Sequence, residues 1–170
     1  MKGLRFGVSE HKTNKRPLFK VIKTGLMTTF QDLGRFGYQK FGVVTSGAMD
    51  PFALQVANLL VGNRRSEAGM EMTMMGPELT VLSPVTAAIS GADLNPQVNG
   101  EPAPMWKSFQ LKEGDRLAFT KPRAGLRAYL CVSGGFDVPV VMGSKSTYVK
   151  AGIGKTIEKE DTIHGGQMID

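Results

Sequence analysis

Three side chains able to recognise a small polar substrate stand together in the sequence QDLGRFG at residues 31–37. Gln31 offers an amide, Asp32 a carboxylate and Arg35 a guanidinium. The planar guanidinium can grip a substrate carboxylate through two parallel hydrogen bonds while the amide fixes its orientation. The alternative is an ion pair between Asp32 and Arg35 that closes a structural turn. Both interpretations stay open at this point.

A second polar segment, SGAMDP at residues 46–51, combines Ser46 with the expected start of a helix. The free amides of a helix N-terminus attract a carboxylate or a phosphate. Asp50 is also a good N-cap and would then occupy those amides itself, with Pro51 at the first helical position. The segment therefore predicts either an anion-binding helix end or a capped one.

The chain has few residues for other kinds of chemistry. Cys131 is the single cysteine, and His11 and His164 both lie near the ends. This excludes an intrachain disulfide and a cysteine zinc site, and it argues against Ser-His-Asp and Cys-His catalysis. Cys131 lies in an apolar run and is expected to be a buried, inert thiol. GIGK at 152–155 is too short for a phosphate-binding loop.

The elements that must position these residues are mostly short strands. A first strand is expected at residues 19–23, and one helix at 51–61, with Phe52, Val56, Leu59 and Leu60 at helical spacing and Gly62 closing it. Further strands are expected at 68–74, 78–82, 85–90, 97–98, 106–111, 116–120 and 127–133, with a hairpin turn at Asn99-Gly100 between residues 97–98 and Glu101. Alternation in residues 68–74 places Glu71 opposite the methionines, on the outer face. Such spacing predicts a mainly β protein, a closed or nearly closed antiparallel barrel with one packed helix.

The charge of the chain is concentrated at its start. Residues 1–20 carry six basic and one acidic side chain, and the remaining 150 carry 15 basic and 14 acidic. We therefore expect a basic flexible leader at residues 1–17 and one domain at 18–170. The nearly neutral body predicts no nucleic-acid partner, and no apolar stretch is long enough to cross a membrane. A cytoplasmic location is the resulting expectation.

Several segments together resemble one known family. They are QDLGRFG, SGAMDP, EMTMMGPEL, AAISGADL and RAYLCVSGGFDVP, between about residues 19 and 154. The chain resembles the N-terminal half of the biotin-dependent carboxyltransferase family of KipA-type proteins, also described as allophanate hydrolase subunit 2 and as the C component of 5-oxoprolinase. The resemblance implies a cyclophilin-like antiparallel β-barrel.

The resemblance also implies an activity. The chain would be a subunit of an ATP-dependent amide hydrolase that opens 5-oxo-L-proline to L-glutamate, or of a related urea or allophanate carboxyltransferase-type complex. Gln31, Asp32, Arg35, Ser46 and Asp50 would bind the substrate in a polar cleft. Catalytic residues are not identified in this chain, so we expect it to be inactive alone.

Partners and cofactors follow from the same resemblance. A KipI-like protein (the B component of 5-oxoprolinase) and a protein of the A-component type are the implied partners, and association with itself is a further expectation. ATP would serve the assembled complex, biotin would serve only carboxylase relatives, and neither is expected on this chain; no metal is expected. The alternative function is a regulatory protein that sequesters a KipI-like inhibitor of a sensor histidine kinase.

Overall fold

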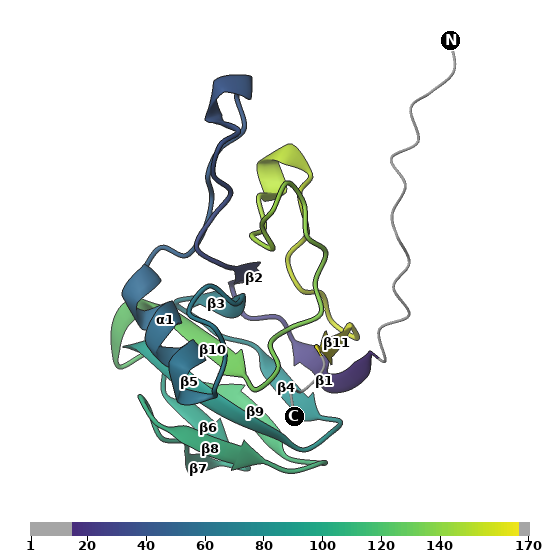
Figure 1. The fold of residues 1–170 in the computed structure, drawn as a ribbon. Coiled ribbons are helices and arrows are strands. Elements are labelled where there is room, and N and C mark those ends of the chain that lie inside the picture. Colours follow the sequence, from purple (N-terminus) through teal and green to yellow (C-terminus); the bar gives the residue numbers. More distant parts are fainter. Residues whose placement is uncertain (1–14, 167–170) are drawn as a thin grey trace.

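The computed structural model describes residues 15–166, which form a mainly β domain of two antiparallel sheets with one α-helix (Figure 1). The order in the six-stranded sheet is β11 (Thr162–Gly165), β1 (Arg16–Lys23), β4 (Glu78–Val81), β9 (Arg116–Phe119), β6 (Pro96–Val98), β7 (Glu101–Pro102). The order in the five-stranded sheet is β2 (Met27–Gln31), β3 (Gly69–Thr73), β10 (Ala124–Val132), β5 (Val85–Asp93), β8 (Ser108–Leu111).

The larger of the two apolar clusters among the described residues lies between the sheets. It includes Phe19, Met70, Leu79, Leu117 and Leu130, all fully buried. These side chains occupy alternate positions in their strands, because successive residues of a strand point to opposite faces. The mainly β antiparallel fold with one main α-helix is therefore confirmed. No ladder joins the two sheets among the described residues, so the barrel is open there.

The helix α1 (Pro51–Leu60) covers the outer face of the five-stranded sheet, against β5 and β10. Asp50 caps it as expected, with its carboxylate accepting from the Ala53 amide at 3.0 Å. The buried face differs from the expected one: Ala53, Leu54 and Ala57 are buried, whereas Phe52 is 69% exposed. Small alanines allow the helix to approach the sheet closely, so the largest apolar residues do not mark the packed face.

Two strands and one burial assignment were not anticipated. β2 escaped notice because MTTFQ is rich in polar side chains, although four of its five residues are buried. β11 pairs with β1 at Arg16 and Pro17, so the first strand begins earlier than residue 19. Residues 1–14 of the expected leader lie outside the described residues.

Glu71 was expected on an outer face but is buried, because the helix side of this sheet is covered as well.

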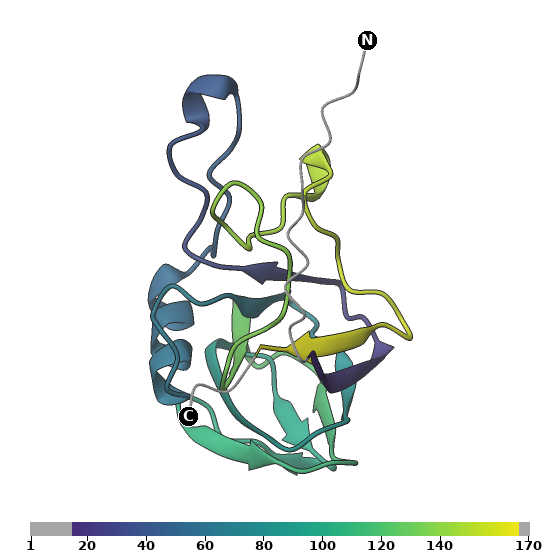
Figure 2. The same ribbon diagram turned by 45° about the vertical axis from the view of Figure 1, so that its right-hand side comes forward.

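Two long loops extend from the same end of the domain, as both views show (Figures 1 and 2). We call residues 32–50 the first arm and residues 137–161 the second arm. The first arm contains the 3-10 turn η1 (Gln39–Phe41) and the second contains η2 (Val149–Ala151). Within residues 15–166, no helix has the length and apolar character needed to cross a membrane.

Candidate functional site

The base of the two arms is held by the carboxylate of Asp32. Its Oδ1 accepts hydrogen bonds from the hydroxyls of Ser144 at 2.7 Å and Ser146 at 2.6 Å, and from the Gly34 amide at 2.8 Å. Its Oδ2 accepts from the Lys145 amide at 2.6 Å. Asp32 is only 8% exposed. One carboxylate of the first arm therefore organises a turn of the second arm, and hydrogen bonds to an ionised acceptor are strong.

Arg35 holds the same turn from another side. It is 1% exposed, and its Nε donates to the Val141 carbonyl at 2.8 Å while Nη2 donates to the Ser146 carbonyl at 2.9 Å. Nη1 is buried without a hydrogen-bond partner. The described residues show no ion pair between Asp32 and Arg35, so the turn-closing pair considered from sequence is not formed. Both side chains instead bind residues 141–146, Arg35 through backbone carbonyls and Asp32 through two serine hydroxyls and one backbone amide.

Gln31 and Ser46 extend this network by one residue. Gln31 donates to the Thr147 carbonyl at 3.1 Å, and the Ser46 hydroxyl donates to the same oxygen at 2.8 Å. Ser46 has a φ of 55°, a conformation uncommon for residues other than glycine. We call Gln31, Asp32, Arg35 and Ser46 the arm-base network. All four residues form hydrogen bonds with residues 141–147. The sequence did not predict this convergence.

A cavity of about 330 Å³ lies beside residues 141–147, beneath the second arm. Most of its lining surface is apolar, from residues such as Phe30, Val138 and Ile153. The polar and ionisable residues of the lining are Ser146, Thr147, Thr156, Asp137, Lys145, Lys155, Asp161 and His164. None of the arm-base residues lines this cavity. They fix the segment that forms one of its walls, and an apolar cavity with a few polar groups is the usual form of a small-molecule site.

Asp50 lies apart from the arm-base network. Its amide donates to the Tyr129 hydroxyl at 2.8 Å, and that hydroxyl donates to Glu71 at 2.7 Å. Glu71 is buried and also accepts from the Met49 amide and from Arg127, each at 2.9 Å. Burial and the hydrogen bond to Glu71 raise the pKa of Tyr129. This cluster fastens the end of the first arm to the five-stranded sheet, and Asp50 itself serves as a helix cap.

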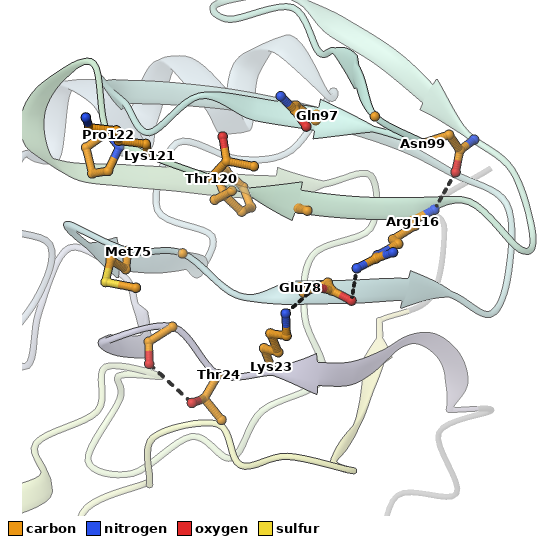
Figure 3. A pocket seen from close by; sticks show the side chains of 15 residues that line it. Lys23, Thr24, Met75, Glu78, Gln97, Asn99, Arg116, Thr120, Lys121 and Pro122 are labelled. Atoms are coloured by element: carbon orange, nitrogen blue, oxygen red, sulfur yellow. Dashed lines mark hydrogen bonds and ion pairs between the residues drawn. The ribbon is translucent and has the colours of Figure 1, made fainter.

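A second, more open hollow of about 1110 Å³ lies on the six-stranded sheet (Figure 3). Glu78 is held there between Arg116 at 2.7 Å and Lys23 at 3.4 Å. The hydrogen bond from Arg116 lowers the pKa of Glu78. The two cations are largely exposed. The hollow can offer hydrogen bonds to a polar ligand, but it contains no pair of carboxylates for acid–base catalysis and none of the sequence-predicted site residues.

Cys131 is fully buried, as expected, and burial raises the pKa of its thiol, which keeps it protonated and unreactive. Met70 and Met72 lie in the core, whereas Met74 and Met75 are about half exposed. No cluster of residues suited to a metal is present among residues 15–166. The GIGK segment does not fit a phosphate, because Lys155 is paired with Asp161 at 3.0 Å.

We predict that Asp32 makes stability depend on acid pH. Burial raises the pKa of its carboxyl, but hydrogen bonds from Ser146, Ser144, Lys145 and Gly34 outweigh burial and leave the pKa below its ordinary value. A lowered folded-state pKa stabilises the fold above the unfolded-state pKa, and this is lost as the pH falls through the folded-state value. Between about pH 5 and pH 3, the Tm should fall more steeply in the wild type than in Asp32→Asn. Parallel Tm curves for the two proteins would contradict this.

The fold and the site define a class before any relative is considered: a small two-sheet β domain that fixes two arms over a cavity. A family model described as "Carboxyltransferase domain, subdomain A and B" matches residues 41–169. The chain belongs to this carboxyltransferase-domain family.

Individual relatives agree with the family. The chain is 41% identical to the C component of 5-oxoprolinase from Escherichia coli (strain K12) over 141 residues, which is 81% of this chain and 44% of that protein. It is 39% identical to urea amidolyase of Lachancea kluyveri over 80% of this chain and 8% of that protein. The crystal structure of K. lactis urea amidolyase superposes with a TM-score of 0.86 at 33% identity, over 94% of this chain and 10% of that chain. The chain thus spans less than half the length of these relatives.

Sequence analysis missed Ser144, Ser146, Glu71 and Tyr129. The run GSKST at 143–147 was a usable signal, since a glycine followed by closely spaced hydroxyl residues suits a turn around an anion. Nothing local in the sequence pairs that run with Asp32, which lies more than a hundred residues earlier.

Proposed function

We propose that this chain is the substrate-positioning part of an enzyme-complex subunit that acts on a small amide. The preferred reaction is the ATP-dependent opening of 5-oxo-L-proline to L-glutamate, with transfer of a carboxyl group to urea as the related alternative. The observation that carries the proposal is the 41% identity to a protein named as the C component of 5-oxoprolinase, which extends over 81% of the chain.

The cavity beneath the second arm is the proposed substrate site. Its volume of about 330 Å³ suits a small molecule, since ligand pockets start at roughly 300 Å³. 5-Oxoproline has an apolar ring face and a polar rim of amide and carboxylate. The apolar lining of the cavity, including Phe30 and Ile153, would contact the ring, and Ser146, Thr147 and Thr156 would face the rim.

In this proposal the arm-base network does not line the cavity but holds residues 144–147 in place. They fix the wall of the cavity, which keeps its polar groups in place for the substrate. Of the three guanidinium nitrogens of Arg35, Nε and Nη2 bind carbonyl oxygens, and Nη1 is buried without a hydrogen-bond partner. Direct contact with a substrate carboxylate would therefore use this atom after the turn opens. Asp50 contributes by holding the end of the first arm.

The chemical steps are divided among several proteins. A lactam carbonyl is a poor electrophile because of amide resonance, so hydrolysis requires its activation before water adds to the carbonyl carbon and the C–N bond breaks. No cysteine lines the cavity, and the GIGK segment is too short for a phosphate-binding loop. Activation by ATP is assigned to the two partners, the KipI-like protein and the protein of the A-component type, and this chain is inactive alone.

The test is glutamate release by the complex reconstituted from this chain, both partners, ATP and 5-oxo-L-proline. Thr156→Phe, which fills the cavity, should lower kcat/KM by roughly a hundredfold. Lys159→Phe adds the same bulk at an exposed position outside the cavity lining and should leave kcat/KM unchanged. Normal turnover by Thr156→Phe would show that the cavity is not the site. No turnover by the wild-type mixture, despite binding of the KipI-like protein, would favour the regulatory function.

A further inference from the structure

The tips of the two arms are built alike. Each contains a 3-10 turn with a lysine in it, Lys40 in η1 and Lys150 in η2. Each turn is closed by a glycine in the left-handed region, Gly42 at φ 78° and Gly152 at φ 67°. Neither turn contains a buried residue, and a Cβ added to either glycine would meet no atom within 4 Å. Packing among residues 15–166 does not explain these tips.

Large apolar side chains gather on the arms and face solvent. Phe36 is 65% exposed and Phe41 is 70% exposed on the first arm, and Val140 and Val149 are 63% and 54% exposed on the second. Single exposed apolar residues are ordinary, but several on two neighbouring projections are typical of a protein-binding surface. Phenylalanine is also enriched at the centres of such surfaces.

Each arm as a whole has as many acidic as basic side chains, but the acidic ones lie at or near the bases of the arms. Residues 33–49 contain two basic and no acidic side chains, and residues 138–157 contain three basic and none acidic. Arg35 binds backbone carbonyls, Lys145 is paired with Glu67, and Lys155 is paired with Asp161. Among the described residues of these two segments, Lys40 and Lys150 are the cations without an ion pair. Lys40 lies 5.0 Å from the centre of the Phe41 ring.

The arm-base network fixes the arms relative to each other at their bases. Asp32 and Arg35 of the first arm hold residues 141–146 of the second through hydrogen bonds of 2.6–2.9 Å. A surface held in one geometry before binding loses less conformational entropy when a partner arrives. The two tips can therefore act as one preorganised fork.

We propose that the two tips together form a docking surface for a partner protein whose facing surface is apolar and bordered by carboxylates. The proposal rests on the proposed function and names the part of this chain that meets its partner. Lys40 and Lys150 favour an acidic partner through charge complementarity. They disfavour contact with the tips of a second copy, because like charges would then face each other.

The test is binding of the purified chain to the KipI-like protein, measured by calorimetry at low and high salt. Phe41→Ser and the double variant Lys40→Glu/Lys150→Glu should each weaken binding by roughly tenfold or more. The double variant should also lose most of the salt dependence. Leu126→Ser and Lys112→Glu are matched controls, since both residues are exposed and lie outside the arms. Both controls should bind like the wild type.

Three results would overturn the proposal. If the wild type binds and the tip variants bind equally well, the docking surface is elsewhere, and the proposed function still stands. If the wild type does not bind the KipI-like protein, the proposed complex is wrong and the docking proposal falls with it. If light scattering shows a dimer of this chain that Phe41→Ser abolishes, the tips contact a second copy and not a different protein.

Discussion

Asp32→Ala is expected to lower the free energy of unfolding by about 3 kcal/mol, because buried donors lose an ionised acceptor. Four hydrogen bonds disappear at once, two from serine hydroxyls and two from backbone amides. The measurement is urea unfolding, combined with hydrogen exchange at the Lys145 amide. That amide should exchange much faster in the variant, since it loses its acceptor on Asp32.

Asp93→Ala is the matched control for this experiment. Asp93 accepts one backbone hydrogen bond from Asn95 and pairs with Arg123 at 3.6 Å, in a more exposed position. Its removal should cost about 1 kcal/mol or less, since exposed ion pairs contribute little. An Asp32→Ala variant no less stable than Asp93→Ala, with unchanged exchange at Lys145, would show that the arms do not depend on this carboxylate.

Arg35→Lys should also be strongly destabilising, with a loss of about 2 kcal/mol, although the charge is kept. The planar fork reaches Val141 through Nε and Ser146 through Nη2, and a lysine ammonium cannot take both positions. A Tm measurement tests this, and the loss should occur in the isolated chain, without substrate or partner.

Arg116→Lys provides the comparison at a surface site, where the arginine side chain is 61% exposed and pairs with Glu78. Its substitution should leave the Tm nearly unchanged, since exposed ion pairs contribute little. If Arg35→Lys is equally mild and instead raises KM in the assembled complex, Arg35 contacts substrate directly. That outcome would contradict a role in fixing the second arm.

Local patterns were sufficient for most of the fold. Alternating apolar residues and turn signals located nearly every strand, and the Asp50-Pro51 start located the helix. The strand β2 was not predicted, because its threonines are polar and yet buried: Thr28 is 1% and Thr29 is 4% exposed. The predicted packed face of α1 was wrong, because the small residues Ala53 and Ala57, and not the largest side chains, lie against the sheet.

Only the arm-base network of the candidate site could be selected from the sequence. QDLGR and Ser46 could be selected from residue types, but their partners are distant in the sequence. Arg35 was expected to bind a carboxylate, of a substrate or of Asp32, because a guanidinium prefers such ligands. It binds backbone carbonyls of residues 141–146 instead. Glu71 alternates with buried methionines and would be exposed on a one-sided sheet. It is buried because α1 and the end of the first arm cover the second face.

The most direct test of the account is omission of this chain from the reconstituted complex. Glutamate formed from 5-oxo-L-proline and ATP is measured with the KipI-like protein and the A-component-type protein alone, with this chain alone, and with all three together. We expect turnover only in the complete mixture, and its restoration when this chain is added back. Equal turnover without this chain, or turnover by this chain unaided, would contradict its assignment as the substrate-positioning part of a multi-subunit enzyme.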